Sequence, residues 1–187
     1  MEFRDLLLND NVTNYKIVDE DIKSFQLLFD NELDNSIPVS IKWEEILLQK
    51  SEQKLDCDFC LIEEYDTLII SSKAKESLSS FLSDCNIEFL PCKTESGSFY
   101  ILNITELIKE SIIEESSEFE SSEQGTITNI TNLVFYFESI ENKPIFKIKE
   151  LPYVTFISDE FEEFCLTHNL TGIDFSEDNP YIAADFI

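Results

Sequence analysis

The chain has 187 residues, of which 43% are hydrophobic, and it carries a formal net charge of −26 from 39 acidic and 13 basic side chains. The hydrophobic content excludes a disordered acidic tail and is sufficient for one domain with a sizeable core. The charge excludes nucleic acid and anionic membranes as partners, because both are negative, and it favours a basic protein. The alternative is that the acidic surface only keeps the protein soluble.

The N-terminus and the cysteines indicate a cytoplasmic protein. Residues 1–5 are charged, and Leu6, Leu7 and Leu8 form too short an apolar run for a secretory signal. No run approaches the roughly 20 apolar residues that span a bilayer. Five cysteines, an odd number, are typical of reduced thiols in a chain without an export signal.

Residues 1–65 are expected to form an N-terminal lobe, which either stands apart or belongs to the same domain as residues 66–187. Residues 1–14 have no clear pattern and are expected to be a frayed start. After them the pattern predicts a strand at Tyr15–Val18, a helix or strand at Phe25–Phe29, a strand at Val39–Ile41, a helix at Trp43–Gln49 and a strand at Leu55–Ile62.

The stretch from Leu68 to Asn103 is predicted to organise the rest of the chain. Residues 68–70 are an apolar strand, and Ser71 or Ser72 is placed to cap the helix that follows. That helix has one apolar face, and Asn86 is expected to take a left-handed turn after it. The next elements are a strand at Ile87–Leu90 that Pro91 ends, a turn at Glu95–Ser98 and a strand at Phe99–Leu102.

A similar unit is predicted near the C-terminus. A strand at Val154–Ile157 leads to the capping residue Ser158, a helix at Glu160–His168, Gly172 and a strand at Ile173–Phe175. Ile87 follows Ser71 by 16 positions, and Ile173 follows Ser158 by 15. The two strand–helix–strand units are therefore either a pseudo-repeat or a chance pairing of two common units.

The segment between the two units is predicted to contain both strands and a loop. Residues Glu106–Ile113 are expected to form a helix, and Glu114–Gly125, rich in serine and glutamate, an exposed loop. Strands are predicted at Ile127–Phe137 and Ile145–Ile148, a turn at Leu151–Pro152 and a core-covering tail at Pro180–Ile187. The predicted fold class is α+β, with a mixed sheet and a few packed helices.

Four segments carry a resemblance to a known family: ISSKAKESL, IEFLPCK, FYILNIT and IFKIKELPYVTFISDEFEEFCLTHNLTGIDF. They resemble a family of bacterial immunity proteins that are encoded beside polymorphic or contact-dependent toxins and whose type member is from Myxococcus. The resemblance covers about residues 69–175, with a gap over residues 110–128, and Asn169 stands where the family pattern has glycine. It implies a cytoplasmic immunity protein that binds and neutralises a cognate toxin by direct contact and is not an enzyme. An alternative from another class is an acidic decoy that mimics DNA and inhibits a nucleic-acid-binding protein.

The sequence offers no convincing catalytic or metal-binding constellation, so no catalytic residue, metal or cofactor is predicted. Cys57 and Cys60 have the spacing of half a zinc site, for which Cys85 and Cys92 are the nearest further ligands, or of a redox dithiol. The third interpretation, buried and inert cysteines, is preferred. His168 is expected at a helix end, where a cation favours the helix dipole, and a dyad of His168 with Cys165 is the catalytic alternative.

A cluster of acidic residues remains as the candidate partner-binding site. The predicted site residues are Glu110, Glu114, Glu115, Glu118, Glu120 and Glu123, with Phe119 as an apolar anchor. A basic toxin domain is the expected partner of such a surface. The alternative is a solvated loop without a partner.

Overall fold

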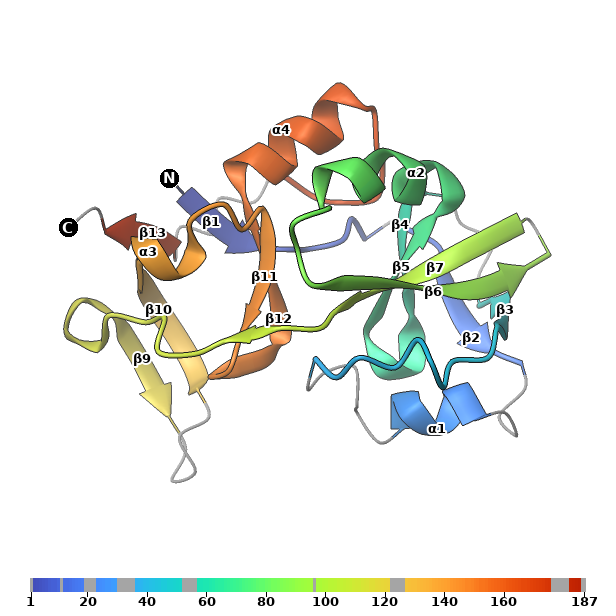
Figure 1. Ribbon diagram of the computed structural model, residues 1–187, viewed down its shortest axis with the longest axis horizontal. Coiled ribbons are helices and arrows are strands. Elements are labelled where there is room, and N and C mark those ends of the chain that lie inside the picture. The colour runs from blue at the N-terminus through green and yellow to red at the C-terminus, as the bar shows by residue number, and fades with distance from the viewer. Residues whose placement is uncertain are drawn as a thin grey trace.

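Two β-sheets lie side by side in this protein (Figure 1). The computed structural model describes residues 2–10, 12–18, 23–29, 36–51, 57–95, 97–121, 127–175 and 182–185. One sheet is a closed barrel, the other has seven strands with parallel and antiparallel pairs, and helices α2 and α4 lie together above both. The predicted α+β fold with a mixed sheet is confirmed.

The barrel has the strand order β2-β3-β6-β7-β5-β4. Its strands are β2 (Asn14–Ile17), β3 (Ile46–Lys50), β4 (Phe59–Ile62), β5 (Thr67–Ser71), β6 (Ile87–Thr94) and β7 (Gly97–Ile104). Alternate apolar side chains, such as Ile46 and Leu48 of β3, fill the interior, and α1 (Lys23–Phe29) lies against one end with Leu28 in the same core. A division of the chain at residue 65 remains a prediction, and this barrel pairs strands from both sides of it.

The second sheet has the strand order β8-β11-β12-β1-β13-β10-β9. Its strands are β1 (Glu2–Asp5), β8 (Leu107–Ile108), β9 (Glu118–Ser121), β10 (Ile127–Tyr136), β11 (Ile145–Ile148), β12 (Leu151–Ser158) and β13 (Ile182–Asp185). The rings of Phe135 on β10 and Phe146 on β11 are only 5.7 Å apart. Four strand spacings in a flat sheet would separate them by roughly 19 Å, so the sheet is strongly curled around its own aromatic core. The short helix α3 (Phe137–Ile140) connects β10 to β11.

Helices α2 (Ser72–Phe81) and α4 (Asp159–Thr167) join the two sheets. Ser71 and Ser158 cap them, accepting hydrogen bonds from the amides of Ala74 and Phe161, so both predicted caps are confirmed. The buried cluster beneath the helices combines side chains of the barrel with side chains of the seven-stranded sheet. Its members include Phe59, Ile70, Leu78, Leu102, Ile145, Ile157, Phe161 and Cys165. The two β-sheets are therefore packed on one shared core.

Both predicted units contain the strand and the helix, but only the first contains the third element. After α2 the chain enters β6, which lies beside β7 and β3 in the barrel. After α4 the left-handed residue is Asn169, with φ 51°, and Ile173 forms only an isolated bridge to Leu8. The expected strand at residues 173–175 is therefore wrong.

The frayed start expected for residues 1–14 is also wrong. Strand β1 lies inside the seven-stranded sheet, between β12 and β13, and Phe3 is buried in its aromatic core. Strand β13, from the predicted tail, runs parallel to β10 and covers the other side of β1. Both chain ends therefore complete one sheet, a long-range pairing that local periodicity does not reveal.

Residues 39–49 differ from the expected strand and helix. Residues 40–42 form a turn in which Ile41 is fully exposed, and β3 occupies the end of the expected helix. The Glu88 carboxylate accepts hydrogen bonds from the amides of Val39 and Ser40 at 2.8 and 3.1 Å, which fixes this turn. A carboxylate 48 residues away in sequence therefore determines the local conformation.

Two proline predictions and one asparagine prediction are wrong. Pro91 lies inside β6, which continues to Thr94, because β3 pairs with β6 only from Cys92 onward and needs no amide hydrogen from Pro91. Pro152 lies inside β12, and the turn comes before it, at residues 149–150. Asn86 does not adopt a left-handed conformation, and its side chain instead donates a hydrogen bond to Glu106.

Candidate partner-binding groove

The chain from Lys109 to Ser117 crosses from one edge of the curled sheet to the other. The helix expected at Glu106–Ile113 is wrong: β8 pairs with β11, and the backbone beyond it is bonded to β10. The amide of Ile113 donates to Val134 O and the amide of Tyr136 donates to Ser111 O, at 2.8 Å each. Because these groups bond across the sheet, they cannot form the i to i−4 bonds of a helix.

The segment expected as a loop, residues 114–125, is structured over its first part. A 3-10 turn at Glu114–Ser116 leads to β9, which pairs with β10. Ser117 fixes the junction, because its hydroxyl donates to Ile113 O at 2.8 Å and accepts from the amide of Val134 at 2.9 Å. Glu123 and the rest of residues 122–126 lie outside the described residues.

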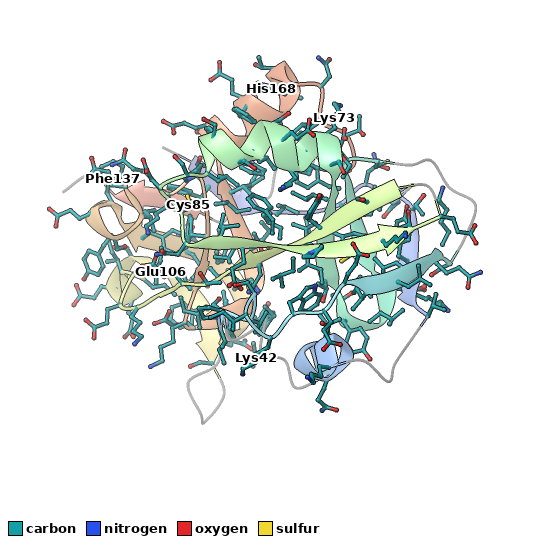
Figure 2. All side chains as sticks on the ribbon, turned by 45° about the vertical axis from the view of Figure 1, so that its right-hand side comes forward. Lys42, Lys73, Cys85, Glu106, Phe137 and His168 are labelled. Atoms are coloured by element: carbon teal, nitrogen blue, oxygen red, sulfur yellow. The ribbon has the colours of Figure 1, made fainter. Side chains whose placement is uncertain are left out.

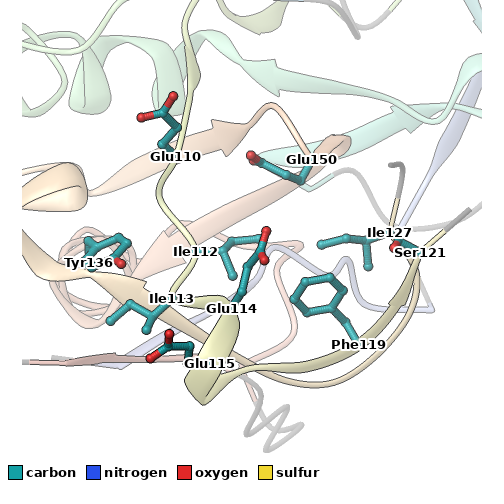
Figure 3. A pocket seen from close by; sticks show the side chains of 10 residues that line it. All are labelled: Glu110, Ile112, Ile113, Glu114, Glu115, Phe119, Ser121, Ile127, Tyr136 and Glu150. Atoms are coloured by element: carbon teal, nitrogen blue, oxygen red, sulfur yellow. The ribbon is translucent and has the colours of Figure 1, made fainter. Parts of the chain in front are cut away.

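A groove of about 650 Å³ opens between this segment, β9 and the turn that joins β11 to β12 (Figure 3). Its walls combine buried isoleucines and two aromatic side chains with four carboxylates. They are Ile112, Ile113, Phe119, Ser121, Ile127, Tyr136, Glu110, Glu114, Glu115 and Glu150. The volume lies within the range of roughly 300–1,000 Å³ typical of ligand pockets. The groove therefore has an apolar floor and an acidic rim.

The structure brings together four of the seven predicted site residues in this groove: Glu110, Glu114, Glu115 and Phe119. Phe119 is half-buried and packs against the aromatic core, as an anchoring position requires. Glu118 and Glu120 are exposed on β9 and do not line the groove, because alternate residues of a strand point to opposite faces. That these residues bind a partner remains a prediction.

Sequence reasoning missed Glu150. It lies in the turn between β11 and β12, and its Oε2 atom is buried without a hydrogen-bond partner among the described residues. Figure 3 shows its side chain at the edge of the groove opposite Phe119. Glu150 is 31 positions from Phe119 in the sequence, so no local pattern connects the two.

No basic side chain neutralises the groove within the described part of the chain. The groove glutamates form no salt bridge there, whereas Glu106, before β8, is paired with Lys143 at 2.7 Å. The hydrogen bonds from Lys143 and Asn86 lower the pKa of Glu106 and keep it ionised. Nearby acidic residues thus differ in role: Glu106 connects parts of the fold, and the groove glutamates have no basic partner among the described residues.

The cysteines are distributed over the cores. Cys60 and Cys92 are buried in the barrel core, and burial raises the pKa of the Cys92 thiol. Cys85 packs against the separate cluster beneath the helices. Among the described residues, no three His, Cys, Asp or Glu side chains form a possible metal site.

His168 is the C-terminal cap of α4, so its predicted place at a helix end is confirmed. Its ring stacks on Phe164 with centroids 3.9 Å apart, and its Nδ1 lies 2.9 Å from the carbonyl oxygen of Phe164. Cys165 is fully buried, and burial raises its pKa to about 12, so its thiol is not ionised at neutral pH. The burial of the Cys165 thiol and the contact of His168 Nδ1 with the helix backbone therefore do not favour a Cys165–His168 dyad.

A sequence profile of the immunity protein family (Imm11) matches residues 46–178, which is 133 of the 187 residues. The chain therefore belongs to this immunity protein family, and its function is an immunity function. The resemblance predicted over residues 69–175 is confirmed and extends to residue 46, so the matched region includes the whole groove. Comparison with curated proteins gives no match. No helix in the described ranges has the length and apolar character needed to cross a membrane.

Proposed function

We propose that the protein confers immunity by binding a cognate toxin directly, through the groove, in the cytoplasm of the cell that produces both. The observation that carries this proposal is the groove itself, with its apolar floor and four uncompensated glutamates. An apolar centre excludes water and supplies affinity, while charged rims select partners of opposite sign and accelerate association. The proposed partner is accordingly a toxin domain with a basic surface, and the protein inhibits it without catalysis.

The net charge of the whole chain supports the same partner. A charge of −26 creates a field that attracts a basic protein from beyond contact distance. Because salt screens this field over about 10 Å at 0.1 M, added salt is expected to slow association. The field attracts the partner, and the groove is the site at which the partner binds.

The test is a neutralisation assay in cells that express the neighbouring toxin domain, with two variants of equal charge. The groove variant replaces Glu110, Glu114, Glu115 and Glu150 by glutamine. The control variant replaces four exposed glutamates on α2, on the β6–β7 hairpin and on α4: Glu76, Glu95, Glu160 and Glu163. Both lose four negative charges, so only the location of the charge differs.

We expect the control variant to protect cells as well as the unmodified protein does, and the groove variant to lose protection. In purified form the groove variant should bind the toxin domain at least about 100-fold more weakly, since charges in and around an interface each contribute on the order of 1 kcal/mol or more. Equal loss of protection in both variants would contradict binding through the groove and would indicate an effect of net charge alone. Recovery of many DNA-binding proteins from a lysate by both variants alike would favour the acidic decoy.

A further inference from the structure

The groove carries two features that specify the chemistry of its occupant more narrowly than charge alone. The first is Glu150, whose Oε2 atom is buried and unpartnered within the described part of the chain. A buried carboxylate oxygen without a donor costs free energy, and the cost is recovered when a donor reaches it. Because Glu150 also lines the groove, an occupant of the groove can supply this donor when the side chain turns toward it.

The second feature is the free edge of β9. In the described part of the chain β9 pairs only with β10, and it is the last strand of the seven-stranded sheet. Phe119 projects from the middle of this strand into the groove, so the groove lies beside β9. An extended peptide can add to such an edge by main-chain hydrogen bonds, while alternate side chains enter neighbouring pockets.

The walls of the groove favour a guanidinium over an ammonium group. Phe119 is half-buried, Tyr136 is 46% exposed, and both belong to the groove, so a cation there meets aromatic faces as well as carboxylates. Guanidinium is planar, weakly hydrated and able to stack on a ring while it donates two parallel hydrogen bonds to a carboxylate. Ammonium is compact and strongly hydrated, and it loses more on entering an apolar groove.

We propose that the groove binds an extended, arginine-bearing segment of the partner, which adds to the free edge of β9 and places a guanidinium against the buried carboxylate of Glu150. This inference rests on the proposed function only in identifying the partner as a toxin. The recognition itself belongs to the groove and can be measured without the toxin.

The experiment titrates the isotope-labelled protein with blocked seven-residue peptides of alternating valine and arginine and follows the amide signals by NMR. Matched peptides carry lysine or the neutral arginine analogue citrulline in place of arginine. A further pair carries N-methyl groups along one edge of the backbone or along the other. Glu150→Gln is compared with Glu76→Gln, an exposed position on α2 that has the same charge change.

We expect the arginine peptide to shift the amide signals of residues 118–121 and 149–151, and to bind roughly tenfold more tightly than the lysine peptide, as one extra charge-assisted hydrogen bond allows. Glu150→Gln should remove this preference, Glu76→Gln should not, and N-methylation should abolish binding along one edge only. Equal affinity for arginine and lysine, or equal effects of the two substitutions or of the two methylated edges, would overturn the proposal. The outcome of this peptide titration does not decide whether the protein neutralises a toxin, which the cell assay measures separately.

Discussion

Asp58 is the residue that connects the barrel most directly to the chain after α4. Its carboxylate accepts hydrogen bonds from Ser71 Oγ at 2.7 Å, Lys73 Nζ at 2.9 Å and the Thr171 amide at 3.0 Å. Lys73 also donates to Asn169 O, and Figure 2 shows Lys73 close to the end of α4 that carries His168. One buried carboxylate thus joins the start of α2 to the segment that follows α4.

These hydrogen bonds determine the charge state of Asp58. Burial alone would raise its pKa, but the hydrogen bonds from Ser71, Lys73 and Thr171 outweigh burial and lower the pKa below its ordinary value. A group with a lowered pKa in the folded state stabilises the fold above the pKa of the unfolded chain, near 3.9. That contribution is lost as the pH falls below about 4 and through the lowered folded pKa.

Replacing Asp58 by asparagine should therefore lower the free energy of unfolding by about 1–3 kcal/mol at pH 7, because buried donors lose a charged acceptor. The difference from the unmodified protein should shrink as the pH falls below about 4, because the unfolded chain takes up the proton first, and it should level off below the lowered pKa of the folded carboxylate. Urea unfolding at a series of pH values measures both effects. Asp84→Asn, at an exposed position, is the control and should change stability by less than about 0.5 kcal/mol. A pH-independent difference for Asp58→Asn would contradict the linkage.

At the scale of elements, α2 and α4 depend on each other and on both sheets. Phe81 and Phe164 stack with ring centroids 4.2 Å apart, and Leu78 of α2 is fully buried in the cluster that joins the sheets. Neither helix is long enough to be stable alone, since isolated helices shorter than about 12–15 residues are marginal in water. Their packing against the shared core therefore maintains them.

Truncating Leu78 to alanine should destabilise the protein by roughly 2–5 kcal/mol, through lost burial and a cavity in the shared core. Because the cluster includes side chains of both sheets, the barrel and the seven-stranded sheet should lose stability together. Denaturant unfolding, followed by aromatic fluorescence and by circular dichroism, should show one coincident transition at lower denaturant. Leu166→Ala on α4, where the side chain is 57% exposed, should leave the midpoint nearly unchanged. Two separate transitions would show that the sheets do not share a core.

The sequence is sufficient for elements whose determinants are local. The caps at Ser71 and Ser158 act three residues away, and β10 and β11 are recognisable from continuous β-branched and aromatic runs. Short apolar stretches are ambiguous: residues 46–50 are a strand because Ile46 and Leu48 alternate into the barrel. Trp43, Ile46 and Leu47 nevertheless have the spacing of one helix face, which is why the pattern predicts a helix there. The roles of Asp58 and Glu150 cannot be predicted from local patterns. Asp58 bonds to Thr171, which lies 113 positions away in the sequence. Glu150 lines the groove only because the sheet is curled.

At the scale of the whole molecule, the fold separates a connecting region from a surface that is free for a partner. The helices and Asp58 hold the two sheets together on one side, where their side chains are committed to internal contacts. The segments that line the groove, around β9 and the turn before β12, lie away from α2 and α4 (Figure 1). Mutations in the groove are therefore expected to affect partner binding with little effect on folding.

Amide hydrogen exchange on the complex with the toxin domain tests this central claim most directly. The groove proposal predicts that residues 109–121 and 149–151 exchange more slowly in the complex, while α2, α4 and the β6–β7 hairpin keep the rates of the free protein. Protection confined to the helices or the hairpin, with unchanged exchange at the groove, would contradict it.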